Sequence, residues 1–147
     1  MSRLQLRAAV LAQGRDSAPP EDPGSVWVLD VTRLPAGYTL SNGNQTMLSK
    51  ALQANQLDTL LDRVISVDEV RQFKVSPASY GLLTSHFGCA PKDILFVSSN
   101  AWDVIGAGWF GLTTFWVNRQ NLPFEEIGPK PTYTGANLND VLASLPA

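Results

Sequence analysis

The sequence predicts an α/β fold in which a parallel β-sheet is flanked by helices in three layers, as in Rossmann-like domains. Short apolar runs alternate with segments of helical periodicity, which is the order that parallel sheets require. The runs 94–98 and 113–117 are almost wholly apolar, as is typical of strands buried on both faces. The 147 residues, of which 44% are hydrophobic and 16% charged, are enough for one buried core.

From Tyr38 onward each expected element has a local reason. The β-branched run 63–67 favours a strand. Ser76 followed by Pro77 is a typical helix start, and Gly88 is a typical helix end. The expected strands comprise 38–41, 63–67, 94–98 and 113–117, and the expected helices comprise 47–52, 76–88, 103–111 and 138–145.

The N-terminal residues differ from the rest in composition. Residues 1–15 contain three arginines and no acidic side chain, and residues 16–24 contain three prolines and a glycine. Such a composition disfavours regular structure, so we expect a flexible N-terminal segment over residues 1–25 and a core domain over residues 26–147. An arginine-containing start without acidic residues is also compatible with a mitochondrial presequence.

Composition and charge argue against several classes of function. The net charge of −2 and the pI near 5.2 argue against a nucleic-acid binder. No apolar run approaches the roughly 20 residues needed to cross a bilayer, so no membrane span is expected. The single cysteine, Cys89, cannot form an internal disulfide or a cysteine-cluster zinc site, which favours a cytoplasmic location. His86 and Cys89 flank a helix end, where packing is the ordinary role and a catalytic Cys–His pair is the alternative.

Three polar clusters fall at or beyond the predicted carboxyl ends of strands, where parallel sheets hold their sites. They are Ser41-Asn42-Gly43, Lys74, and Ser98-Ser-Asn-Ala-Trp-Asp103. The first can hold an anion on its backbone N–H groups, although Asn-Gly is also an ordinary turn. Lys74 can neutralise charge that develops in a reaction, although most lysines are solvated. Asp103 can orient that lysine or activate water, and helix capping is the alternative.

The order of these clusters resembles the type II 2-haloacid dehalogenases of the haloacid dehalogenase-like hydrolases. The strings that carry the resemblance are Ser41-Asn-Gly43, Ser66-Val-Asp-Glu-Val-Arg-Gln-Phe-Lys74, Leu95-Phe-Val-Ser-Ser-Asn-Ala-Trp-Asp103 and Phe115-Trp-Val-Asn-Arg119. The resemblance extends from Tyr38 to the C-terminus, and the string that ends at Asp103 is its most specific part. It implies a core of the same α/β class that works without a metal or other cofactor.

The resemblance also implies a reaction. In that family an aspartate attacks the halogen-bearing carbon of a short (S)-2-haloacid, halide leaves, and water hydrolyses the resulting ester to the 2-hydroxy acid. Carried over, Ser41 would bind the substrate carboxylate and Asn42 would help to hold the leaving halide. The other implied roles are Lys74 beside the nucleophile, Tyr80 near the substrate, Trp102 lining the halide pocket, and Ser98, Asn100 and Asp103 positioning Lys74 and the water.

The chain departs from the family pattern at its N-terminal end. The family's nucleophilic aspartate lies in a strand near the N-terminus and a helical cap domain follows, and neither pattern is visible in this sequence. Asp30, in the run 26–34, is the candidate nucleophile, yet only ten residues lie between it and Ser41, fewer than a parallel crossover needs. We therefore expect a truncated core without a cap, whose exposed strand edge would favour association, for example as a homodimer.

Two other functions stay open. A chain that keeps the fold and an anion pocket without turnover would be a non-catalytic remnant or interaction module. A small phosphatase of the same superfamily would hold magnesium with an additional acidic residue in the last motif, whereas residues 98–103 contain one carboxylate. No metal is therefore expected, and the expected partner is a small-molecule 2-haloacid.

Overall fold

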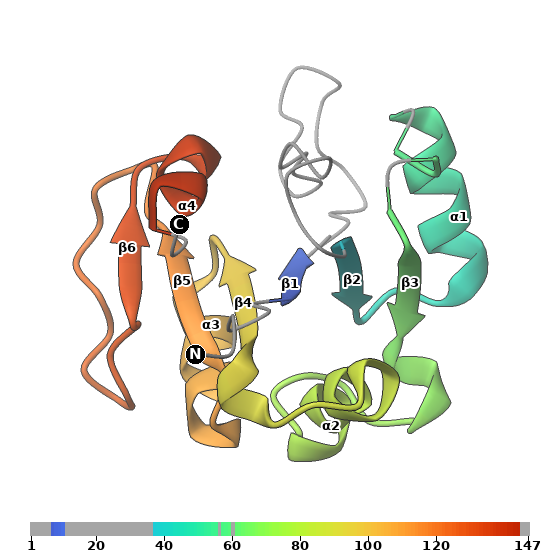
Figure 1. The fold of residues 1–147 in the computed structure, drawn as a ribbon, viewed down its shortest axis with the longest axis horizontal. Coiled ribbons are helices and arrows are strands. Elements are labelled where there is room, and N and C mark those ends of the chain that lie inside the picture. The colour runs from blue at the N-terminus through green and yellow to red at the C-terminus, as the bar shows by residue number, and fades with distance from the viewer. Residues whose placement is uncertain (1–6, 11–36, 56, 60, 145–147) are drawn as a thin grey trace, which may run out of the picture.

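Parallel strands form one sheet in the order β3-β2-β1-β4-β5-β6 (Figure 1). The computed structural model describes residues 7–10, 37–55, 57–59 and 61–144. The strands are β1 (Arg7–Val10), β2 (Gly37–Ser41), β3 (Arg63–Ser66), β4 (Ile94–Ser98), β5 (Thr113–Val117) and β6 (Tyr133–Gly135). The predicted parallel sheet is confirmed, and the predicted strands correspond to β2, β3, β4 and β5.

β1 lies in the centre of the sheet, paired in parallel with β2 on one side and β4 on the other. The sequence predicts a flexible segment here, and for residues 7–10 that expectation is wrong. Arg7-Ala-Ala-Val10 has no apolar alternation and little β-branched character, so pairing on both sides, rather than local preference, decides its conformation. Asp30 lies outside the described residues, and the division of the chain at residue 25 stays a prediction.

Helices follow most of the strands. Within the described ranges they are α1 (Gln45–Ala54), α2 (Pro77–Phe87), α3 (Ala101–Phe110) and α4 (Leu138–Ser144), with single-turn helices η2 (Val67–Glu69) and η3 (Pro91–Asp93). Ser76 caps α2 by accepting a hydrogen bond from the Ala78 N–H, and Gly88 ends it with a left-handed φ of 66°, as predicted. α3 begins at Ala101, slightly before the predicted start at residue 103.

α2 and α3 pack against each other and cover the same part of the sheet. In the view of Figure 1 they lie below the strands, whereas α1, beside β3, and α4, beside β6, lie above. The core under α2 and α3 contains Leu40, Ile65, Tyr80, Leu83, Phe96 and Ala107. Burial of these apolar side chains supplies the main favourable term for folding. Among the described residues, no helix has the length and apolar character needed to cross a membrane.

Candidate active site

The strands β2, β3 and β4 all end in a buried serine that starts a turn. In each turn the serine Oγ accepts a hydrogen bond over 3.1 Å from the N–H two residues further on: Ser41 from Gly43, Ser66 from Asp68, and Ser98 from Asn100. A hydroxyl that binds the backbone in this way stops the strand and fixes the direction of the loop that follows. The candidate site is built from these loops, at the carboxyl edge of the sheet.

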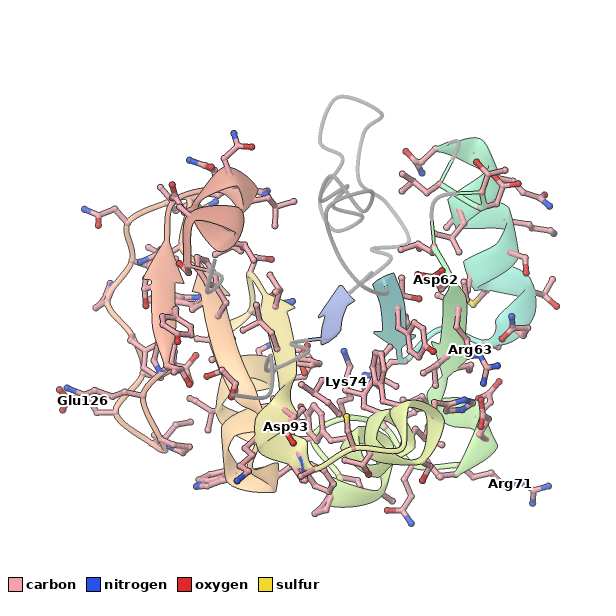
Figure 2. The ribbon with its side chains drawn as sticks, in the orientation of Figure 1. Asp62, Arg63, Arg71, Lys74, Asp93 and Glu126 are labelled. Carbon is pink, nitrogen blue, oxygen red and sulfur yellow. The ribbon has the colours of Figure 1, made fainter. Side chains whose placement is uncertain are left out.

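Lys74 and Asp103 form a buried ion pair at this edge. Lys74 Nζ lies 3.0 Å from Asp103 Oδ2 and 3.4 Å from the Leu40 carbonyl oxygen. Both charged side chains have 0% exposure. Figure 2 shows Lys74 near the middle of the molecule, close to α2. The structure thus gives neither residue its ordinary role, because the lysine is not solvated and the carboxylate faces the lysine.

Burial sets the protonation behaviour of Lys74. Loss of water around the charged form lowers the pKa of Lys74 from its usual value, and the Asp103 carboxylate offsets part of that decrease. An ammonium group has three N–H donors, and the described residues provide two acceptors for it, Leu40 O and Asp103 Oδ2. The third N–H has no acceptor among the described residues, and the side chain is buried from water, where charge acts strongly.

Tyr80 holds the second oxygen of Asp103. The buried Tyr80 Oη donates to Asp103 Oδ1 over 2.7 Å, and Ser98 Oγ donates to Oδ2 over 3.4 Å. Burial, together with the charge of Asp103 and its hydrogen bond, raises the pKa of Tyr80 far above its usual range, so the phenol stays a donor. Because both of its oxygens are engaged, Asp103 is suited to orienting Lys74 and poorly suited to attacking a substrate.

Asn42 and Ser41 present donors at the end of β2. Asn42 Oδ1 accepts a hydrogen bond from the Lys74 backbone N–H over 2.9 Å, so the NH2 end of the amide is the part left to bind an anion. The Ser41 oxygen accepts from Gly43, and its hydroxyl hydrogen has no acceptor within the described part of the chain. Both side chains therefore offer N–H or O–H groups beside the Lys74 loop.

Trp102 and Asn100 complete the group. The ring centroid of the half-buried Trp102 lies 5.9 Å from Lys74 Nζ, at a distance where an aromatic face stabilises an ammonium. Asn100 sits in the turn held by Ser98, and its carbonyl accepts from Asp103 N and so begins α3. The predicted site residues that lie together are Ser41, Asn42, Lys74, Tyr80, Ser98, Asn100, Trp102 and Asp103. The candidate nucleophile Asp30 lies outside the described residues.

Two further residues shape the site and were not among the predicted ones. Ser66 Oγ donates to the Gly43 carbonyl over 2.8 Å, which ties the loop after β2 to the end of β3. Trp116 Nε1 donates to the Ser99 carbonyl over 3.2 Å and so holds the turn after β4. Ser66 carried a usable signal, because it ends a strand as Ser41 and Ser98 do. Trp116 carried no such signal. It lies in an apolar strand, where a tryptophan that donates a hydrogen bond to the site looks the same in the sequence as one that only packs in the core.

His86 and Cys89 have structural contacts. The His86 ring nitrogens lie 2.7 Å from Arg63 Nη1 and 3.1 Å from Glu69 Oε2 near the surface. Cys89 is half-buried and packs against the core under α2. Over the described ranges, no group of three or more His, Cys, Asp or Glu side chains is arranged to hold a metal ion.

The fold and the site together define a class of protein, namely an α/β domain with a charged centre at the carboxyl ends of parallel strands. Comparison with known families makes the assignment specific. The chain belongs to the haloacid dehalogenase-like hydrolase family, whose model matches residues 38–111. The matched segment contains the loops after β2, β3 and β4 and thus all of the predicted site residues that the structure brings together.

The curated relatives include several (S)-2-haloacid dehalogenases. The chain is 44% identical over 112 residues to (S)-2-haloacid dehalogenase 1 of Pseudomonas sp. (strain CBS-3), a match that covers 74% of this chain and 48% of that protein. It is 46% identical over 93 residues to (S)-2-haloacid dehalogenase 4A of Burkholderia cepacia, covering 61% of this chain and 40% of that protein. The chain therefore spans about half the length of the curated relatives it matches.

Solved structures give the same result. A crystal structure of an L-2-haloacid dehalogenase matches with a TM-score of 0.73 and 42% identity over 86% of this chain and 55% of that one. The L-2-haloacid dehalogenase of Xanthobacter autotrophicus with chloropropionic acid covalently bound matches with a TM-score of 0.72 and 29% identity, covering 80% of this chain and 58% of that chain.

Proposed function

We propose that the protein is a hydrolase of the 2-haloacid dehalogenase type, which converts short (S)-2-haloacids to 2-hydroxy acids with release of halide. The observation that carries the proposal is the buried Lys74–Asp103 pair, which Tyr80 and Ser98 orient and which has one N–H left for a carboxylate. The names of the relatives and the covalently bound chloropropionic acid in the Xanthobacter autotrophicus enzyme support the same chemistry.

The first step is a displacement at C2 of the haloacid. A carboxylate oxygen of the protein forms a bond to C2 while the carbon–halogen bond breaks, and the halide leaves with the bonding electron pair. In the proposal, the remaining N–H of Lys74 holds the attacking carboxylate and the Ser41 hydroxyl binds the substrate carboxylate. The Asn42 NH2 group binds the departing halide, and Trp102 lines its pocket.

The second step is hydrolysis of the ester. Water adds to the ester carbonyl carbon and the bond from that carbon to the substrate oxygen breaks, which releases the 2-hydroxy acid and regenerates the carboxylate. Ser98 and Asn100 are proposed to hold this water, and Asp103 to keep Lys74 in place. The oxygen of the water thus enters the protein carboxylate, and the product hydroxyl oxygen comes from that carboxylate.

Asp30 is the proposed nucleophile. Asp103, the carboxylate that contacts Lys74, is engaged through both oxygens and is fully buried. Under single-turnover conditions, with the protein in excess over L-2-chloropropionate in oxygen-18 water, the attacking aspartate should acquire the label. Peptide mass spectrometry would then find it in the peptide that contains Asp30, and Asp30→Asn should abolish both the label and turnover. Label on any other residue would reassign the nucleophile.

Halide release from L-2-chloropropionate by the purified chain, without added metal, tests the activity itself. Lys74→Ala should abolish release, whereas Lys92→Ala, which removes an exposed lysine, should leave it unchanged. A folded chain that releases no halide would favour the non-catalytic interaction module. Phosphate release from a generic ester that depends on magnesium would instead favour the phosphatase.

The remaining parts of the proposal concern location and association. A mildly acidic chain with net charge −2 is proposed to act in the cytoplasm without nucleic-acid partners and to associate as a homodimer. Light scattering during size-exclusion chromatography measures the mass in solution, and a monomer at micromolar concentration would contradict the dimer.

A further inference from the structure

α3 carries a glycine where it passes Tyr80. A Cβ atom at Gly106 would lie 2.6 Å from Tyr80 Oη and 2.8 Å from Val75 Cγ1. A Cβ atom does not approach a non-bonded heavy atom so closely, so any side chain at this position would force a neighbour to move. Gly106 lies inside the helix, where glycine is less favourable than alanine, so the helix itself gives no reason for it.

Tyr80 has little room to retreat from such a side chain. Its side chain is fully buried, with its ring centroid 5.6 Å from that of Phe96 and 6.2 Å from that of Phe110. The same Oη that Gly106 leaves free donates to Asp103 Oδ1 over 2.7 Å and lies 3.2 Å from the Asp103 carbonyl oxygen. A shift of a few tenths of an ångström would lengthen the hydrogen bond that fixes the carboxylate.

The other helical glycines do not have this relationship. The nearest atom to a Cβ at Gly81 would be a ring carbon of Phe110 at 3.8 Å, which is ordinary contact. A Cβ at Gly108 would meet the Pro129 ring at 3.0 Å, away from any polar group of the site. Of these three helical glycines, Gly106 is the one at which an added Cβ would collide with the Lys74–Asp103–Tyr80 group.

We infer that Gly106 is a positioning residue, whose lack of a side chain lets the Tyr80 hydroxyl reach Asp103 and thereby holds the carboxylate against Lys74. The inference deepens the proposed function: a role of Gly106 in turnover rests on the chain being the proposed hydrolase. The contact itself needs no turnover to be tested, because it changes stability and the environment of one phenol.

A double-mutant cycle in the full chain isolates the contact. Gly106→Ala, Tyr80→Phe and the combined variant are compared by urea unfolding, with Gly81→Ala as the matched glycine-to-alanine control. Gly106→Ala should reduce the folding equilibrium constant about tenfold more in the parent chain than in the Tyr80→Phe background, where the obstructing oxygen is gone. The close approach to Val75 is present in both backgrounds and cancels. Gly81→Ala should leave the folding equilibrium constant unchanged or raise it.

A spectroscopic signature separates positioning from simple packing. In protein labelled with carbon-13 at tyrosine Cζ, the Tyr80 signal is assigned by its loss in Tyr80→Phe, and Tyr38 and Tyr133 serve as internal references. Gly106→Ala should move the Tyr80 signal because the hydrogen bond to Asp103 is lengthened, and Gly81→Ala should leave it in place.

The results of urea unfolding and of the Tyr80 signal either support or overturn the positioning role of Gly106. If Gly106→Ala alone does not fold, folding of the combined variant with Tyr80→Phe supports the inference, since removing the oxygen relieves the clash. An equal loss of stability in both backgrounds, an unmoved Tyr80 signal, or failure of the combined variant to fold better than Gly106→Ala would overturn it. Absence of halide release by the parent chain would overturn the proposed function and leave these results untouched.

Discussion

The side-chain oxygen of Asn42 accepts the backbone N–H of Lys74 over 2.9 Å, across a sequence separation of 32 residues. This hydrogen bond joins the loop after β2 to the loop that carries the ammonium group. It also orients the amide, because the oxygen is committed and only the NH2 end is left. The hydrogen bond therefore fixes the Asn42 amide relative to the loop that carries Lys74.

Substitutions of Asn42 separate its two roles. Asn42→Asp keeps an oxygen acceptor for the Lys74 N–H but replaces the amide donor with a negative charge, so we expect near-normal stability and loss of halide release. Asn42→Ala removes both and should cost about 1 kcal/mol of unfolding free energy as well. Urea unfolding and halide release measure the two effects. Full activity in Asn42→Asp would contradict an anion-holding role for the amide.

Removal of the Lys74 charge tests the buried pair. Lys74→Met leaves the Asp103 carboxylate buried without its counter-ion, and we expect a loss of about 3–5 kcal/mol in the free energy of unfolding. The combined variant with Asp103→Asn should lose clearly less, because no uncompensated charge is left and the amide oxygen still accepts from Tyr80. Equal losses in urea unfolding would show that the two charges are not coupled.

Ser66→Ala tests the link between β3 and the loop after β2. The change removes the hydrogen bond to the Gly43 carbonyl and the acceptor for Asp68 N, and should cost about 1–2 kcal/mol of unfolding free energy. Displacement of the loop should raise the KM for the haloacid more than it lowers kcat. Ser85→Ala is the control. Among the described residues the exposed Ser85 Oγ has one hydrogen-bond partner, Gly81 O within α2, and its loss should change stability by less than about 0.5 kcal/mol.

The stability of the protein should fall above pH 10 in a way that depends on Tyr80. The pKa of Tyr80 is raised in the folded protein, so between its usual value near 10.0 and the folded value only the unfolded chain loses the proton. Folding stability from this group is intact below pH 10 and is lost as the pH rises, by up to about 1.4 kcal/mol per pH unit. Tyr80→Phe should reduce this decline in urea unfolding between pH 9 and pH 11.

Lys74 contributes with the opposite sign to the same experiment. Its pKa is lowered in the folded state, so the cost of burying its charge is relieved as the pH rises toward its usual value of 10.5. The difference between the parent chain and Tyr80→Phe largely removes this contribution, since both contain Lys74. An identical pH dependence of the two proteins would contradict the buried, protonated phenol.

Local patterns predicted those parts of the fold that local preferences decide. The almost wholly apolar run 94–98 corresponds to β4, and the Ser76-Pro77 pair corresponds to the start of α2. Both could be predicted because burial on both faces and helix capping restrict which residue types occur at neighbouring positions. β1 has no comparable sequence pattern, because its extended conformation depends on pairing with β2 and β4. β6, with three residues, is too short for any periodicity.

Within the site, too, local features could be predicted and long-range contacts could not. Strand-end position, together with the family resemblance, pointed to the serines and to Lys74, but which group each one contacts depends on how α2 and α3 pack. The hydrogen bond from Tyr80 to Asp103 spans 23 residues and needs bare backbone at Gly106, and no spacing rule encodes that combination. The hydrogen bond from Trp116 to Ser99 likewise follows from the pairing of β4 with β5.

The central place of β1 has a consequence for the order in which the molecule assembles. Within the sheet, β2 and β3 meet β4, β5 and β6 only through this short strand, where Arg7 pairs with Ile94 and Val10 with both Thr39 and Val97. Pairings between residues so far apart in the chain are slow to form, because a large loop must close first. Lys74 comes from one half of the molecule and Asp103 from the other. In a folding chain in which these halves have not yet met, Lys74 and Asp103 are both present but apart, so the buried ion pair between them forms only together with the long-range contacts made through β1.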